Sequence, residues 1–252
     1  MNTLGTLVDV ERYQREGYLI ISGVLPAHRL PPLLAEADRL TNLFGQQPQR
    51  YAARIQWEVN YLAEDERTGM QNVIRKLEPI IDLSPIFAEL AFDEQVVGPA
   101  AAIFGEPVEL FEDKLNLKLP GGSRYLWHQD WSCCWRAHTD ELITCFVYLE
   151  DADLTNGCLQ VIPASHLGKP LLPFNAGNRL EVAPEYVDKS RIVPVLLNAG
   201  DMIVFDPYLL HFSDRNGSKA PRRTIIYTYN PARLGKVNEG RFPDDWKGAG
   251  GM

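Results

Sequence analysis

The second half of the chain constrains the fold most, because from residue 106 it consists of short runs of β-branched and aromatic residues. Gly, Pro, Asn and Asp separate these runs, which is typical of the strands and turns of all-β sandwiches and barrels. We expect the strands to form a jelly roll, or double-stranded β-helix, in which two sheets enclose a pocket. The candidate strands are Val108–Leu119, Leu126–Asp130, Ile143–Leu149, Leu159–Val161, Ile192–Val195, Met202–Phe205, Leu210–Ser213 and Arg223–Tyr229.

A helical pattern occupies most of the first hundred residues. Between Leu30 and Phe44, apolar side chains recur at steps of three and four, which predicts an amphipathic helix with one buried face. Pro26 is expected to open this helix. The other predicted elements are a short strand and three helices, at Tyr18–Ile21, Val10–Glu16, Pro85–Ala91 and Glu94–Phe104.

The length of 252 residues is enough for one large domain with a sizeable core. We therefore predict a single, mainly β domain with α elements, in which N-terminal helices pack on the jelly roll. Its parts would be a mainly helical segment, a jelly-roll core and a C-terminal tail, at residues 1–105, 106–230 and 231–252.

Charge and composition argue against several partners. The chain has 33 Asp and Glu against 25 Lys and Arg, a net charge of −8, and no basic run, so we expect no nucleic acid partner. No apolar stretch is long enough for a membrane span, and residues 1–10 lack the pattern of a secretory signal, so we expect no membrane partner. The four cysteines contain no Cys-x-x-Cys pair, which favours reduced thiols and a cytoplasmic location.

Three polar residues in the predicted strands carry the candidate chemistry. His128 and Asp130 stand two apart in one predicted strand, so their side chains project from the same face toward one ion. His211 lies on a later strand that could bring a third ligand alongside. Two imidazoles and one carboxylate form the facial triad of non-haem iron(II) oxygenases, which leaves positions open for cosubstrate and oxygen. A His-x-Asp tripeptide also arises by chance in proteins whose histidines only form hydrogen bonds in a core.

Arg222 and Thr224 strengthen the metal hypothesis. They lie on the same face of the last predicted strand, and a guanidinium fork beside a hydroxyl suits bidentate binding of a carboxylate. The alternative interpretation is a surface arginine, which we favour for Arg223 because its side chain points to the opposite face.

In combination, the motifs resemble the phytanoyl-CoA dioxygenase family of iron(II)- and 2-oxoglutarate-dependent oxygenases, from about Val10 to Asn230. The family pattern usually has glycine where Ala164 stands, so that turn is expected to differ slightly. The resemblance rests on Trp127-His128-Gln129-Asp130, Leu149-Glu150-Asp151-Ala152-Asp153, Asn156-Gly157-Cys158-Leu159, Pro163-Ala164-Ser165-His166, Ala199-Gly200-Asp201, His211 and Pro221-Arg222-Arg223-Thr224.

The resemblance implies a 2-oxoglutarate-dependent non-haem iron dioxygenase. It implies that iron(II) is bound by the three metal-ligand candidates, and that the distal carboxylate of 2-oxoglutarate is bound by Arg222 with a hydroxyl contact from Thr224. Lys118 and Asn116, on the preceding strand, are weaker candidates for the cosubstrate pocket. The metal ligands that the resemblance implies are His128, Asp130 and His211.

The reaction implied by the resemblance is hydroxylation of an unactivated C–H bond in a small-molecule metabolite, with oxygen as the second cosubstrate and release of succinate and CO2. Asp130 favours this outcome, because related halogenases have a small residue at that position, which opens a site for chloride. The same oxidant also serves desaturation and ring closure, and these alternatives remain open.

Substrate contacts are expected from residues that directly follow the metal motif. Trp131, Trp135 and Arg136 should overhang the metal, although core packing is an equally good interpretation for the two tryptophans. A lid over the pocket is expected within residues 50–70, with Arg54, Trp57, Asn60 and Tyr61 as its candidate residues.

Two other classes of protein are considered. One is a metal-dependent isomerase or hydrolase on a cupin-like barrel, and the other is a non-catalytic cupin-like module that holds a small ligand or a structural zinc ion. The intact triad argues against a zinc module, which would have four protein ligands, and an isomerase or hydrolase has no use for Arg222. We predict a monomer or small homo-oligomer whose partner is a small-molecule substrate.

Overall fold

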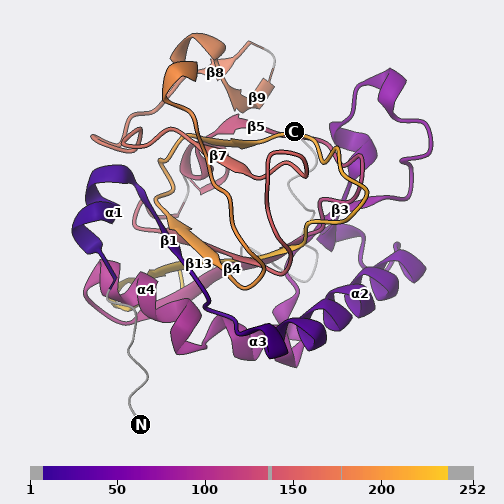
Figure 1. The fold of residues 1–252 in the computed structure, drawn as a ribbon, viewed down its shortest axis with the longest axis horizontal. Coiled ribbons are helices and arrows are strands. Elements are labelled where there is room, and N and C mark those ends of the chain that lie inside the picture. Colours follow the sequence, from indigo (N-terminus) through magenta and orange to yellow (C-terminus); the bar gives the residue numbers. More distant parts are fainter. Residues whose placement is uncertain (1–7, 136–137, 177, 238–252) are drawn as a thin grey trace.

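Two antiparallel sheets form the core of the computed structural model, which describes residues 8–135, 138–176 and 178–237 (Figure 1). The larger sheet has the strand order β1 (Tyr18–Ile21), β11 (Met202–Phe205), β6 (Ile143–Tyr148), β13 (Thr224–Pro231), β4 (Val108–Asn116), β3 (Ile74–Leu77) and β2 (Ile55–Trp57). The smaller sheet has the order β10 (Val193–Pro194), β7 (Leu159–Val161), β12 (His211–Ser213) and β5 (Tyr125–His128). The predicted jelly roll is confirmed.

A cavity of 1230 Å³ lies between the sheets, and residues of β4, β6 and β13 line it together with residues of β5, β7 and β12. The hairpin of β8 (Phe174–Asn175) and β9 (Asn178–Val182) adds Phe174 and Asn178 to the wall. In Figure 1 this hairpin lies at the opposite side of the molecule from the long helices.

The helices α2 (Leu30–Gln46), α3 (Pro85–Ala91) and α4 (Glu94–Phe104) pack on the outer side of the larger sheet (Figure 1). The fourth helix is α1 (Val10–Glu16). The helices α1, α3 and α4 have the predicted bounds, and the side chains of Asp9, Ser84 and Asp93 cap their first turns. The predicted start at Pro26 differs, because a 3₁₀ turn precedes α2. Among the described residues, no helix has the length and apolarity that a membrane span requires.

Short helical turns connect these elements. They are the 3₁₀ turns Ala27–Arg29, Ala52–Arg54, Glu58–Tyr61, Glu64–Glu66, Ile81–Leu83, Pro184–Tyr186, Lys189–Arg191 and Ala232–Leu234, and the π-helical turn Trp131–Trp135.

Side chains along β13 alternate between the two faces of the sheet, and this decides which of them can act in the cavity. Tyr227 and Tyr229 face the helices, where their hydroxyls donate to the backbone oxygens of Phe87 at 2.7 Å and Ala91 at 2.6 Å. Ile226 and Thr228 face the other way and line the cavity. The outer face therefore attaches the helices, and the inner face is left for chemistry.

Several predicted strand boundaries are wrong. The strand expected over Val108–Leu119 ends at Asn116, because Lys118 has a φ of 33° that an extended strand does not accommodate. Four strands were not predicted at all: β8 and β9, which form the separate hairpin, and β2 and β3, which extend the larger sheet through the pairing of Lys76 with Asn116. The mainly helical segment 1–105 thus contributes three strands, with β1, to the jelly-roll sheet.

The turn at Ala164, where the related family usually has glycine, is strained. Its φ is 63°, in the left-handed region that costs a residue with a Cβ about 1–2 kcal/mol. We expect Ala164→Gly to raise the free energy of unfolding by about 0.5–1 kcal/mol in urea titrations, after the entropic cost of glycine. Ala63, with a φ of −61°, is the matched control, and Ala63→Gly should lower stability. Equal losses from both substitutions would contradict the explanation.

Candidate active site

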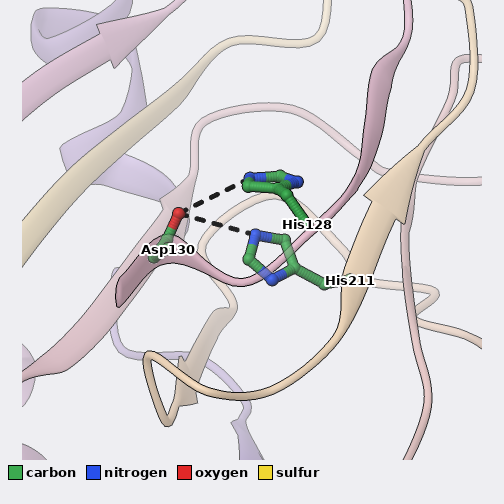
Figure 2. A group of neighbouring side chains, drawn as sticks. All are labelled: His128, Asp130 and His211. Atoms are coloured by element: carbon green, nitrogen blue, oxygen red, sulfur yellow. Dashed lines mark ion pairs between the residues drawn. The ribbon is translucent and has the colours of Figure 1, made fainter. Parts of the chain in front are cut away.

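Neighbouring strands of the smaller sheet bring the two predicted histidine ligands together. His211 of β12 is the direct partner of His128 of β5, and their ring centroids are 4.1 Å apart. The nearest oxygen of Asp130 lies 3.5 Å from Nε2 of His128 and 3.8 Å from Nε2 of His211 (Figure 2). One ligand atom from each residue falls within 4.8 Å of the others, so the three can share one ion.

The expectation that His128 and Asp130 share a strand is wrong. The strand β5 ends at His128, and Asp130 begins the helical turn that continues as the π-helical segment Trp131–Trp135. This turn is held by the backbone N–H of Trp131, which donates to the oxygen of Pro207 at 3.1 Å, and by the Ser132 hydroxyl on the oxygen of Gln129 at 3.0 Å. The carboxylate reaches the histidines because the chain turns toward them.

Backbone carbonyls orient both imidazoles. Nδ1 of His128 is 2.6 Å from the oxygen of Leu126, and Nδ1 of His211 is 2.8 Å from the oxygen of Leu209. A carbonyl oxygen can only accept, so each Nδ1 carries a proton and each Nε2 presents a lone pair toward the shared space. Outer contacts of this kind are typical of metal-binding histidines.

Electrostatics also prepare the ligands in the form that binds a metal ion. Burial and the neighbouring His128 lower the pKa of His211 to about 4, so its imidazole is neutral at neutral pH. Burial opposes ionisation of Asp130, but the adjacent imidazoles of His211 and His128 outweigh it and lower the pKa of this carboxyl. A neutral imidazole at His211 and an ionised carboxylate at Asp130 suit a divalent cation.

The donor set fits a catalytic iron centre. Among the described residues, the cluster contains two imidazoles and one carboxylate and no fourth His, Cys, Asp or Glu. All three residues line the cavity, so the side of the ion away from them would face open space. A closed structural zinc site would show four protein ligands instead.

Arg222 lines the cavity and is 6% exposed. Its Nη1 donates to the hydroxyl of Thr224 at 3.2 Å, and its guanidinium lies 5.5 Å from the ring centroid of Tyr148. Thr224 does not line the cavity, so its contact with a cosubstrate stays a prediction and its observed contact is with the arginine. Arg223 points to the other face, where it pairs with Glu150 and Asp38.

The two weaker cosubstrate candidates separate in the structure. Asn116 lines the cavity and accepts from the Tyr125 hydroxyl at 3.3 Å. Lys118 lies behind the wall, 2% exposed, and its ammonium donates to the Ser213 hydroxyl at 2.8 Å. Burial and the charge of Arg222 lower the pKa of this lysine. Its position indicates that it supports β12 rather than lines the pocket.

Tyr148 is a cavity residue that sequence reasoning missed. It stands opposite Thr224 in the sheet, and its hydroxyl is buried with no hydrogen-bond partner among the described residues. Burial raises its pKa to about 12, so it remains a phenol able to donate. The sequence signal was available, because Tyr148 lies within the predicted strand Ile143–Leu149, but the inward direction of its side chain depended on a register that was not known.

Of the substrate candidates, Trp135 lines the cavity, and its Nε1 donates to Glu112 at 3.3 Å. Trp131 stacks on Tyr208 and does not line the cavity, and Trp57 packs against the main hydrophobic core. Arg136 lies outside the described residues.

The segment expected to form a lid contributes one wall of the cavity, through Asn60, Tyr61 and Glu66 among others. Arg215 holds this segment to the core by an ion pair of 2.6 Å with Glu66. Arg54 points elsewhere and pairs with Asp82 at 2.6 Å.

A jelly roll with one open facial triad defines the class of non-haem iron oxygenases. Residues 13–224 match the phytanoyl-CoA dioxygenase family. The chain belongs to this family and is an enzyme of its dioxygenase class. It is 29% identical over 248 residues to a methylphosphonate hydroxylase of Gimesia maris, covering 97% of this chain and 88% of that protein. It is 26% identical over 245 residues to an ectoine dioxygenase of Bordetella bronchiseptica, covering 88% of this chain and 74% of that protein.

Solved structures agree with the fold. AviO1 from Streptomyces viridochromogenes is 26% identical with a TM-score of 0.69, over 91% of this chain and 96% of that one. EctD from S. alaskensis with bound iron is 23% identical with a TM-score of 0.69, over 91% of this chain and 78% of that one.

Proposed function

We propose that this enzyme hydroxylates an unactivated C–H bond of a small-molecule metabolite, using iron(II), 2-oxoglutarate and oxygen and releasing succinate and CO2. The observation that carries the proposal is the open triad, whose imidazoles are oriented by backbone carbonyls and which lines the same cavity as the buried Arg222. The names of the relatives, a methylphosphonate hydroxylase and an ectoine dioxygenase, support a small polar substrate.

The residues divide the work. His128, Asp130 and His211 would hold the iron, and Arg222, steadied by Thr224, would anchor the distal carboxylate of 2-oxoglutarate. The bound iron and 2-oxoglutarate supply the oxidising power, as the cosubstrate is decarboxylated and oxygen is consumed. The protein would also exclude water from the site and hold one C–H bond of the substrate beside the iron. Phe146, Leu159 and Ile226 provide apolar walls of the cavity for this purpose.

Location and assembly are also proposals. Cys145 and Cys158 are buried free thiols, which suits an enzyme of the reducing cytoplasm. We propose that residues 1–252 act as one domain, because strands from both halves of the chain share the larger sheet. We also propose that the enzyme is a monomer or small homo-oligomer.

The direct test is anaerobic addition of iron(II) and 2-oxoglutarate to the purified chain. We expect a weak visible charge-transfer band that neither component produces alone, followed under air by succinate formation. A chain that binds iron but shows no band with 2-oxoglutarate would contradict the proposed cosubstrate.

A Tyr148→Phe variant tests the cosubstrate end of the cavity. Because the hydroxyl has no hydrogen-bond partner among the residues that the structure describes, its loss should leave the melting temperature of the unliganded protein unchanged or slightly higher. Loss of a donor to the carboxylate should weaken 2-oxoglutarate binding about tenfold, measured by titrating the visible band. Tyr186→Phe, at an exposed position, is the control and should change neither value. A stability loss with unaltered 2-oxoglutarate binding would show that Tyr148 serves packing only.

A further inference from the structure

Charged side chains occupy inward positions of the larger sheet, where a small barrel is normally filled by apolar groups. Lys76 of β3, Glu78 just after it and Lys114 of β4 line the cavity, and Glu112 lies behind Lys114. These four residues, which we call the charged strip, are 13% exposed or less in their side chains. Desolvating four charges is costly and a stable fold does not require it, so the strip points to a role in binding.

The signs of the charges alternate along the strip. The ammonium of Lys76 lies 2.7 Å from Glu78, the same carboxylate lies 3.9 Å from the ammonium of Lys114, and Lys114 contacts Glu112. The strip as a whole is neutral. Toward the cavity, however, it presents both a cation and an anion within a few ångströms of each other.

The register places the strip beside the cosubstrate end of the cavity. Along β13, Thr224 stands between Tyr148 and Asn116, in the row of residues next to Arg222. Ile226, one inward position further, stands between Phe146 and Lys114. Lys114 also lines the same cavity as the metal ligands Asp130 and His211. A group held by Lys114 would therefore lie next to the metal ligands and beyond 2-oxoglutarate.

A ligand with a single charge fits this wall poorly. An anion drawn to Lys114 or Lys76 must also face the carboxylate of Glu78 between them, and a cation drawn to Glu78 must face two ammonium groups. Contacts between like charges in a desolvated site are strongly unfavourable. A ligand that carries both charges can pair each with its opposite and bury no net charge.

We propose that the substrate is a compact dipolar metabolite, with an oxyanion bound by Lys114 and an ammonium bound by Glu78. This inference rests on the proposed function and narrows its substrate class. The short spacing of the two charges on the wall requires an equally short spacing in the ligand, as in an amino acid or an aminophosphonate. Lys114 and Glu78 are then the residues that decide specificity.

The test uses matched probes on the full chain loaded anaerobically with iron(II) and 2-oxoglutarate. Each set contains a dipolar compound, an anionic partner and an amine partner. One set is L-proline, tetrahydrofuran-2-carboxylate and pyrrolidine, and the other is 2-aminoethylphosphonate, propylphosphonate and propylamine. The remaining amino acids are tested as further dipolar probes. Calorimetry should show at least one dipolar probe binding at least about tenfold more tightly than either singly charged partner. The two sets distinguish a carboxylate from a phosphonate.

Single-charge variants give a second, directional readout. Lys114→Met should shift preference toward the amine partner, and Glu78→Gln should shift it toward the anion partner, each by about tenfold. The exposed pair Lys189→Met and Glu185→Gln are controls that should leave the preference unaltered. Circular dichroism melting of each variant identifies any that fail to fold.

The outcomes separate the two hypotheses. Singly charged partners that bind as tightly, failure of every dipolar probe, or variants that shift preference in the same direction would overturn the dipolar assignment. In that case the visible band of iron and 2-oxoglutarate would still appear in the native chain. Absence of that band would overturn the proposed function itself.

Discussion

Replacing Asp130 or His211 with alanine is expected to abolish the visible band of the iron and 2-oxoglutarate complex and to reduce succinate formation below detection. Each substitution removes one of three ligands that meet within 4.8 Å. Changing an outer-sphere partner of a metal ligand already costs about 10–100-fold in affinity, so loss of a ligand should cost at least about 100-fold. Iron binding measured by competition with a chelator, together with the band, gives both values.

Exposed residues of the same type provide the controls. His28 lies exposed in the 3₁₀ turn before α2. Asp140 lies exposed just before β6. His28→Ala and Asp140→Ala should retain the band and the activity. If the triad variants kept normal iron affinity while melting normally, the metal would have to bind elsewhere.

The parts of the site that could be predicted from sequence are those whose spacing is local or whose motif is distinctive. His128 and Asp130 stand only two residues apart, so their side chains still meet at one site although the strand ends at His128 and Asp130 begins a helical turn. Helices α1, α3 and α4 were located because capping side chains and apolar periodicity are also local signals.

The parts that could not be predicted depend on strand register. Lys114 and Glu112 face the cavity side of β4, whereas Asp113 between them faces the helices and accepts from the backbone N–H of Ile80 at 2.6 Å. The run Glu-Asp-Lys on a strand resembles a solvated edge when its partners are unknown. Only the pairing of Lys114 with Ile226 turns these charges inward.

Lys118 and Trp131 are predicted pocket residues that do not line the cavity, and they too show what sequence could not predict. Both stand close in sequence to pocket residues, which made them candidates. The left-handed φ of Lys118 and the π-helical turn that begins at Trp131 redirect their side chains, to Ser213 and to Tyr208 respectively. A single residue out of regular geometry is enough to move a side chain from the pocket to its supporting layer.

Arg222→Ala is expected to raise the 2-oxoglutarate concentration required for half-maximal activity by at least about 100-fold, with little change in iron affinity. The guanidinium is buried in the cavity wall, and two hydrogen bonds from it to a carboxylate are each worth about 1.5–3 kcal/mol. Arg222→Lys keeps the charge but loses the planar fork, so it should recover only part of the affinity.

Lys219→Ala, at an exposed position in the preceding loop, is the control for this prediction and should alter neither constant. Titrations of the visible band at fixed iron, and of iron at fixed 2-oxoglutarate, separate the two affinities. A collapse of iron affinity with an unchanged 2-oxoglutarate requirement would reverse the division of roles between Arg222 and the triad. An equal loss in both would indicate that Arg222 holds β13 in place, because Thr224 and Tyr148 both contact it in that strand pair.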